Sequence, residues 1–279
     1  MTGILRLSMA MVVLSGLGVV VAEGPAQAET LTIGAAPSLR PVFNEILPMF
    51  EREYGASVRA VYGPSQTLRR EIEQGAPIDV FLPAAVEELE KLQKKGLILN
   101  GGHQSYAQTS LVLVMSATSL ATSVSFRDVL PNRTTRIAVG DPGTSALGEI
   151  TARALTKLNP MYKSHYRLLH SQHSEDIVNL LHRGEADMGI VYRVDAINSG
   201  QVRIIDENPA GARVPIRFGV AVVSTCREAS LDVAEEFLDF MGSPRIQKLL
   251  LKYGFDSVPS SSVPSNGLRV EANNVKLKP

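Results

Sequence analysis

Four short segments of the sequence carry hydroxyl side chains at points where an extended stretch turns into a helix. They are residues 35–39, 63–68, 140–147 and 171–177. A serine at such a junction caps the helix by accepting a hydrogen bond from an unpaired backbone N–H. A helix start also presents free N–H groups and the positive end of its dipole to an anion. Each serine alone fits a cap, whereas four such junctions together fit a ring of neutral donors around a small anion.

The segments that hold these junctions predict an α/β protein. From Glu29 onward, short apolar runs alternate with amphipathic stretches. In an open α/β sheet the carboxyl ends of the strands face one crevice, so the four junctions are expected to meet there. We expect strands at 31–35, 58–62, 80–82, 110–115, 136–139, 188–192 and 218–223. We expect helices at 39–50, 86–95, 147–158, 174–183 and 231–241.

Two apolar segments, 110–115 and 218–223, bracket a central block of about 100 residues. We interpret them as crossings between two lobes. Residues 29–112 and 220–255 would then build the first lobe, and residues 113–219 the second. One continuous sheet is the alternative that periodicity leaves open. Residues 256–279 are polar, with Ser and Pro enriched at 257–265, and are expected to form a flexible C-terminal tail.

The first 28 residues have the pattern of a signal peptide. Arg6 precedes a weakly polar to apolar stretch at 7–22, and Ala26-Gln27-Ala28 has the small-x-small form of a cleavage site. The apolar stretch of 16 residues is short for a membrane span. The pattern predicts a mature chain that begins at Glu29 and is exported to the periplasm, with a retained anchor as the alternative.

The composition of the chain disfavours a nucleic-acid partner, a disulfide bond and a lipid anchor. The 28 basic and 28 acidic residues give zero net charge, which disfavours a nucleic-acid partner. The single cysteine, Cys226, excludes an intramolecular disulfide and is interpreted as a small core residue. No cysteine lies near the expected cleavage site, so we do not expect a lipid anchor.

Several motifs follow one another in a distinctive order. They are Ala-Ala-x-Ser-Leu at 35–39, Thr-Leu at 67–68 followed by Glu-Ile-Glu-Gln-Gly-Ala-Pro-x-Asp-Val-Phe at 71–81, Gly-Asp-Pro at 140–142, Glu-Asp-Ile at 175–177, Gly-Ile-Val-Tyr at 189–192 and Tyr-Gly-Phe at 253–255. Together they resemble the periplasmic molybdate-binding proteins of ABC transporters, within the type II periplasmic binding protein superfamily. The resemblance extends from about Leu31 to Phe255.

This resemblance implies a two-lobed α/β fold in which each lobe is a mixed sheet flanked by helices and the ligand lies in the cleft. It implies a tetrahedral oxyanion, molybdate or tungstate, as ligand, with no cofactor. The implied donors are the hydroxyls of Ser38 and Ser65, the backbone N–H groups near Leu147 and at Ile177, and the phenol of Tyr192. The implied partner is the permease of an ABC importer, and the protein is expected to be a monomer.

The sequence departs from the family pattern at two of these places. Pro64 and Gln66 flank Ser65 where relatives carry a run of serines, and Leu147 is bulkier than the usual alanine. These departures keep sulfate or another small anion open as the ligand. A periplasmic domain that senses an anion is a further alternative.

The acidic residues Glu175 and Asp176 suit the first turn of a helix because of its dipole. A carboxylate aimed at a bound dianion would repel it. We therefore expect both side chains to face solvent and only the Ile177 N–H to face the cleft.

Enzymatic motifs are missing from the sequence. The segment 63–67 lacks the second glycine of a nucleophile elbow, and no phosphate loop or zinc-protease helix occurs. His165, His170 and His173 are close in sequence, but their spacing fits no single helix face. We interpret them as surface or loop residues, so neither an enzyme nor a resident metal is expected.

Overall fold

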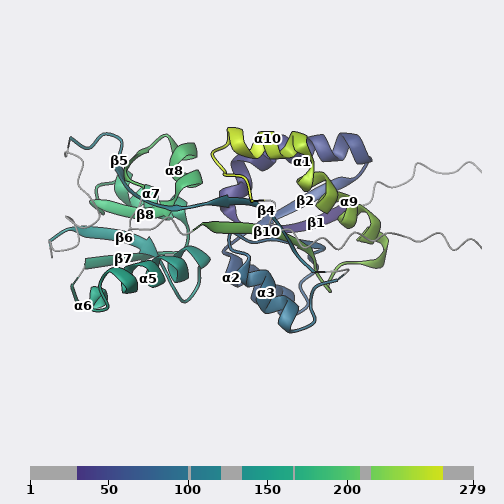
Figure 1. Cartoon of the computed structure of the whole chain (residues 1–279), viewed down its shortest axis with the longest axis horizontal. Helices are drawn as coiled ribbons and strands as arrows, with labels where there is room; N and C mark the ends of the chain where they lie inside the picture. The colour runs from purple at the N-terminus through teal and green to yellow at the C-terminus, as the bar shows by residue number, and fades with distance from the viewer. Residues whose placement is uncertain (1–29, 100–101, 121–133, 166, 208–214, 260–279) are drawn as a thin grey trace, which may run out of the picture.

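The computed structural model describes residues 30–99, 102–120, 134–165, 167–207 and 215–259. The expected signal peptide at 1–28 lies outside these residues, as does the tail from 260 onward. Two lobes lie side by side, and each contains one five-stranded sheet with helices on both faces (Figure 1). The α/β two-lobed fold expected from the sequence is confirmed. No helix of the described residues has the length and apolarity needed to cross a membrane.

The first lobe contains both ends of the described chain. Its sheet has the strand order β2-β1-β3-β10-β4. These strands are β1 (Thr30–Ala35), β2 (Ser57–Tyr62), β3 (Val80–Leu82), β4 (Gln104–Thr109) and β10 (Ile216–Val222). Its helices are η1 (Pro37–Leu39), α1 (Arg40–Tyr54), α2 (Ser65–Glu73), α3 (Glu87–Lys94), η2 (Glu228–Ser230), α9 (Leu231–Gly242) and α10 (Pro244–Lys252). In Figure 1, α1 and α10 lie above the sheet and α2 and α3 below it.

The second lobe is built from the middle of the chain. Its sheet has the strand order β7-β6-β8-β5-β9. These strands are β5 (Leu111–Ser116), β6 (Arg136–Gly140), β7 (Arg167–Ser171), β8 (Met188–Tyr192) and β9 (Val202–Asp206). Its helices are α5 (Ala146–Leu158), α6 (Tyr162–His165), α7 (Ser174–His182) and α8 (Arg193–Ser199).

The two sheets share one topology although the sequence shows no repeat. In each, a strand pairs in parallel with two neighbours, β1 with β2 and β3, and β6 with β7 and β8. An antiparallel strand then follows, β10 beside β3 and β5 beside β8. The carboxyl ends of all six parallel strands therefore have equivalent places in the two lobes, which is the arrangement that places loops at one crevice.

The chain crosses between the lobes at places slightly different from those we expected. Only Ser110 separates β4 from β5, so the second lobe begins at Leu111 and not at residue 113. The return lies between β9 and β10, so the first lobe resumes by Ile216 and not at residue 220. Apolarity continues through the first crossing because the end of β4 and the start of β5 are both buried. The hydrophobic pattern therefore does not mark where a strand changes its pairing partner.

The start of the expected tail is held in place. Asp256 pairs with Gln108 of β4 through two backbone hydrogen bonds of 2.9 and 2.8 Å. The Gln108 side chain also donates to the carbonyl of Ser257 at 2.8 Å. The first residues assigned to a flexible tail are thus an extension of the first sheet, and their polar side chains concealed this pairing.

Helix α1 follows its apolar periodicity. Val42, Phe43, Ile46 and Phe50 are fully buried, as the pattern predicts. Phe50 contacts Phe237 of α9 edge to face, with ring centroids 5.0 Å apart. This core anchors the helix that begins just after the first serine junction.

Two glycines bring the end of β6 against the start of α5. A Cβ on Gly140 would lie 2.5 Å from the backbone N of Gly148, and a Cβ on Gly148 would lie 2.2 Å from the carbonyl carbon of Asp141. Neither backbone can give way without moving the strand end or the helix. The contact therefore fixes where the N-terminus of α5 points.

Replacement of Gly148 by Ala should destabilise the protein by about 1–3 kcal/mol, since the added methyl overlaps backbone atoms. Urea unfolding would measure the free-energy change. Gly242→Ala is the matched control, because a Cβ there meets nothing within 4 Å and alanine is the better helix former. Equal stability of the two variants would contradict this account of the β6–α5 contact.

Candidate functional site

A cavity of about 340 Å³ lies between the lobes at the ends of the parallel strands. Every parallel strand contributes to its wall through the segment that follows it or through its last residue. From the first lobe these residues are Ala36 and Ser38 after β1, Ser65 after β2 and Ala84 after β3. From the second lobe they are Ser145, Ala146 and Leu147 after β6, Gln172, His173 and Ser174 after β7, and Tyr192 at the end of β8.

Four of the five residues implied as ligands therefore meet at one cavity: Ser38, Ser65, Leu147 and Tyr192. They come from both lobes, as a ligand that bridges the lobes would require. The fifth, Ile177, is not among the residues that line the cavity.

Ser65 is the first residue of α2 and is buried. Its Oγ accepts a hydrogen bond from the N–H of Ala84 at 3.0 Å. A hydroxyl that accepts in this way keeps its own hydrogen for another partner. Ser65 is therefore fixed in position and still able to donate into the cavity.

The start of α5 presents backbone donors. Ser145 caps the helix, because its Oγ accepts from the N–H of Gly148 at 3.0 Å, and it donates to the carbonyl of Asp141 at 3.2 Å. The hydroxyl of Ser145 is thus used within the protein. Ala146 and Leu147 are the first two residues of the helix, where N–H groups have no acceptor inside the helix. Both line the cavity, in agreement with a backbone role for Leu147.

The structure does not place Ile177 at the cavity. Its side chain is fully buried, and its N–H donates to the carbonyl of His173 at 3.3 Å. Ile177 is the fourth residue of α7, so its amide already has a partner in the helix. Ser174 and Glu175, in the first turn of the same helix, are the residues that line the cavity.

The two acidic residues of that turn behave differently from each other. Both are solvent-exposed, as expected. Asp176 accepts a hydrogen bond from the N–H of His173 at 3.1 Å, whereas Glu175 also borders the cavity. Because Glu175 is exposed, water screens its charge from a ligand.

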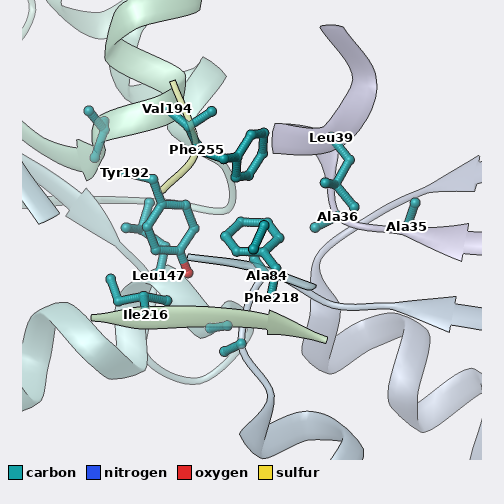
Figure 2. Packing of buried hydrophobic residues seen from close by; sticks show 14 of the residues in the cluster. Ala35, Ala36, Leu39, Ala84, Leu147, Tyr192, Val194, Ile216, Phe218 and Phe255 are labelled. Carbon is teal, nitrogen blue, oxygen red and sulfur yellow. The ribbon is translucent and has the colours of Figure 1, made fainter. Parts of the chain in front are cut away.

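Tyr192 brings a buried phenol to the cavity. Only 3% of the residue is exposed, and its hydroxyl has no hydrogen-bond partner among the described residues. The ring lies against Phe218 of β10, with centroids 6.2 Å apart, and Phe218 contacts Phe255 (Figure 2). Burial, and after it the charge of Asp195, raises the pKa of Tyr192 well above its usual value. The phenol is therefore a rigid, neutral donor.

Sequence reasoning missed two charged residues at the cavity wall. Arg40, the first residue of α1, borders the cavity and holds its guanidinium 4.3 Å from the centroid of the Tyr62 ring. Asp195 of α8 borders it as well and accepts a hydrogen bond from the Ser38 hydroxyl at 2.9 Å. Asp195 lies three residues after Tyr192, so its helical position beyond a strand end was the available signal.

Desolvation raises the pKa of Asp195 to about 6, although hydrogen bonds from Ser174 and Ser38 act in the opposite direction. Asp195 is partly accessible, and this surface lies at the cavity wall. The carboxyl is therefore a titratable group inside a cavity otherwise rich in neutral donors.

Direct contacts join the lobes on either side of the cavity. On one side, Gln66 and Lys91 of the first lobe reach the Glu149 carboxylate at 3.2 and 3.4 Å. On the other side, the Asn198 side chain donates to the carbonyl of Tyr253 at 2.8 Å. Together with the Ser38–Asp195 bond, these contacts hold the two lobes closed around the cavity.

The histidines at 170 and 173 are not part of a group of metal ligands among the described residues. Within the described residues, no three side chains of the His, Cys, Asp or Glu type lie close enough to hold a metal ion. His173 precedes α7 at the cavity wall, and His170 is an exposed residue of β7.

Comparison with known proteins agrees with this architecture. Residues 31–256 match the family described as bacterial extracellular solute-binding protein. The chain belongs to this family. Its members bind solutes, so the protein is a binding protein and not an enzyme.

Individual relatives are similar over nearly the whole described chain. The molybdate-binding protein ModA of Escherichia coli is 30% identical over 230 residues, which cover 81% of this chain and 88% of that protein. The periplasmic molybdate-binding protein of Azotobacter vinelandii has a TM-score of 0.70 at 23% identity, covering 82% of this chain and 99% of that one. The sulfate-binding protein SubI of Mycobacterium tuberculosis has a TM-score of 0.71 at 19% identity, covering 84% and 88%. The two solved structures show the shared fold.

Replacement of Asp195 by Asn should stabilise the ligand-free protein more at pH 7 than at pH 4. A carboxyl whose pKa is raised in the folded state contributes stability below its unfolded pKa and loses that contribution as the pH rises through about 6. The advantage of Asn over Asp should therefore grow across this interval, by at most about 3 kcal/mol. Urea unfolding at several pH values would measure it. Glu175→Gln is the control, since that exposed carboxylate remains hydrated, and an equal pH effect in both variants would contradict the assignment.

Proposed function

We propose that the protein captures a tetrahedral oxyanion, molybdate or tungstate, in the cavity between its lobes. The observation that carries the proposal is the convergence of neutral donors from both lobes on one cavity. The buried Tyr192 phenol without a partner is the most telling of these donors. A buried donor left without an acceptor costs about 1–3 kcal/mol, and an oxyanion in the cavity would supply the acceptor.

Four potential hydrogen-bond donors at the cavity support an oxyanion as the ligand. Ser65 keeps its hydroxyl hydrogen free, because its oxygen is already occupied as an acceptor from Ala84. Leu147 offers a first-turn N–H, and Tyr192 a phenol that stays neutral. Ser38 also lines the cavity. A hydrogen bond from such a donor to a charged oxygen contributes about 1.5–3 kcal/mol each, roughly twice a neutral pair.

The ligand of relatives and the family favour transport over other roles. The ModA relative of Escherichia coli binds molybdate, and the family is one of extracellular solute-binding proteins. We infer that this protein delivers its anion to the permease of an ABC importer. We further infer that it works as a monomer in the periplasm, after cleavage between Ala28 and Glu29.

The volume of the cavity favours one second candidate. About 340 Å³ lies within the range of pockets that hold small organic ligands, about 300–1,000 Å³. Arg40 at the wall could pair with a carboxylate or phosphate group of such a ligand. A small organic anion is therefore the alternative occupant.

Calorimetric titration of the mature protein should rank the ligands. We expect molybdate and tungstate to bind with sub-micromolar affinity, because every oxygen of these dianions is a hydrogen-bond acceptor. Sulfate should bind more weakly, since the smaller ion reaches fewer donors at once. Heat from sulfate alone, or from an organic anion alone, would refute the molybdate assignment.

Replacement of Tyr192 by Phe should weaken molybdate binding about 10- to 100-fold, the loss of one charge-assisted hydrogen bond. The ligand-free variant should be at least as stable as the natural protein, because the change removes a buried hydroxyl without a partner. Tyr106→Phe is the matched control, since Tyr106 in β4 also buries an unpartnered hydroxyl but lies away from the cavity wall. Equal affinities of the two variants would mean that Tyr192 does not contact the ligand.

A further inference from the structure

The wall of an anion-binding cavity is expected to carry hydrogen-bond donors, but Asp195 places a carboxyl there. It lies at the cavity wall on α8 of the second lobe, and its Oδ2 accepts the hydroxyl of Ser38 from the first lobe at 2.9 Å. A hydrogen bond from Ser174 of α7 also reaches this carboxyl. The carboxylate thus collects hydroxyls from both lobes, as an oxyanion would.

This arrangement creates a conflict for Ser38. A serine hydroxyl has one hydrogen, so it donates to one acceptor only. In the structure that acceptor is Asp195. Ser65 differs, because it accepts from Ala84 and keeps its hydrogen for the cavity. For Ser38 to donate to an oxyanion, its bond to Asp195 must break or reverse.

An ionised Asp195 would also stand beside the bound dianion. Like charges at short range in a poorly hydrated site disfavour each other strongly. The other titratable groups at the cavity wall are Arg40 of α1, His173 before α7, Glu175 of α7 and Tyr192 of β8.

Helix α8 also packs on β5 and β9. Strand β5 brings no titratable side chain, and β9 brings Arg203 and Asp206. The pKa of Asp195 is raised to about 6, by desolvation above all. The charge of a dianion beside the carboxyl raises its pKa further, so that Asp195 stays protonated in the complex at neutral and mildly alkaline pH.

We propose that binding of the dianion reverses the Ser38–Asp195 hydrogen bond, with uptake of one proton from solvent by Asp195. The protonated carboxyl then donates to Ser38 Oγ, and Ser38 donates its own hydrogen to the oxyanion. Asp195 is in this sense a positioning and specificity-determining residue. It links the affinity for a dianion to pH. The inference rests on the proposed function, since it requires a dianion in this cavity.

The sign of the pH dependence follows from the proton balance. If the complex holds one more proton than the free protein, affinity falls as the pH rises above the free pKa of about 6. The fall is at most about tenfold per pH unit. Below that pKa the proton is already present, so affinity levels off.

The experiment is calorimetric titration with sodium molybdate at pH 6 and pH 8, each in two buffers of unlike ionisation enthalpy. The difference in heat between the buffers gives the number of protons taken up. We expect a clear net uptake at pH 8 in the natural protein and weaker binding at pH 8 than at pH 6. Asp195→Asn should show no uptake and a flat pH profile, because the amide can donate to Ser38 permanently.

Two further variants separate this mechanism from a purely structural role. Asp195→Ala cannot donate to Ser38, so it should lose proton uptake and bind more weakly at pH 8 than Asp195→Asn. Glu175→Gln removes another carboxylate at the same wall and should retain the uptake. Equal affinity of the Asn and Ala variants would contradict a donated bond to Ser38.

The outcomes distinguish this inference from the proposed function. Molybdate that binds equally well at both pH values with no net proton uptake would overturn the inference and leave the proposed function intact. Absence of molybdate binding at both pH values would refute the proposed function, and the inference would fall with it.

Discussion

Buried donors without acceptors are the constraint on which the arrangement of this protein depends. Parallel strands that end at one crevice leave the first N–H groups of the following helices unpaired. The structure satisfies some of them internally, as Ser145 does for Gly148. Others belong to residues that line the cavity, such as Ala146 and Leu147, and the Tyr192 phenol at the same cavity has no partner among the described residues. Because an unmet buried donor is costly, this surface favours an acceptor-rich ligand and disfavours one that must donate. The backbone geometry that builds the two sheets therefore also determines which kind of ligand the cavity favours.

The lobes are held together by contacts that surround the cavity without filling it. Glu149 accepts from Gln66 and Lys91 across the gap, and it lies in the first turn of α5, whose start lines the cavity. Asn198 on α8 binds the carbonyl of Tyr253 on the opposite side. Each contact is polar and partly or fully exposed, so each adds only about 0–1 kcal/mol. Weak bridges of this kind allow the lobes to separate, which entry of a ligand requires, while a ligand bonded to both lobes would favour the closed form.

The sequence predicted the fold and most of the candidate site because both depend on local rules. Apolar periodicity identified the buried face of α1, and the serine junctions identified where helices begin. It missed β4 and β9, since the polar residues of β4 and the short run of β9 carry no clear period. It also missed α8 and α10, although Ile246 and Leu250 of α10 have the spacing of one helix face. The assignment of Ile177 failed because a motif fixes a helix start only to within a few residues, and the fourth amide of a helix is no longer free. Lobe boundaries were displaced because pairing partners, unlike burial, leave no mark on composition.

Asp195 illustrates a class of residue that a search for ligand donors overlooks. A site for a dianion is expected to exclude carboxylates, yet this carboxyl is bound to the very serine that the family motif identifies as a ligand. Its presence is consistent if the carboxyl acts as an internal substitute for the anion. In the structure it accepts the Ser38 hydroxyl and links the two lobes. When an oxyanion binds, the same carboxyl takes up a proton and donates a hydrogen bond to Ser38 Oγ, so that Ser38 can donate its own hydrogen to the anion. A neutral side chain at this position would not form a charge-assisted hydrogen bond with Ser38. A carboxylate that stayed ionised would repel the bound dianion. A carboxyl that ionises near neutral pH meets both requirements.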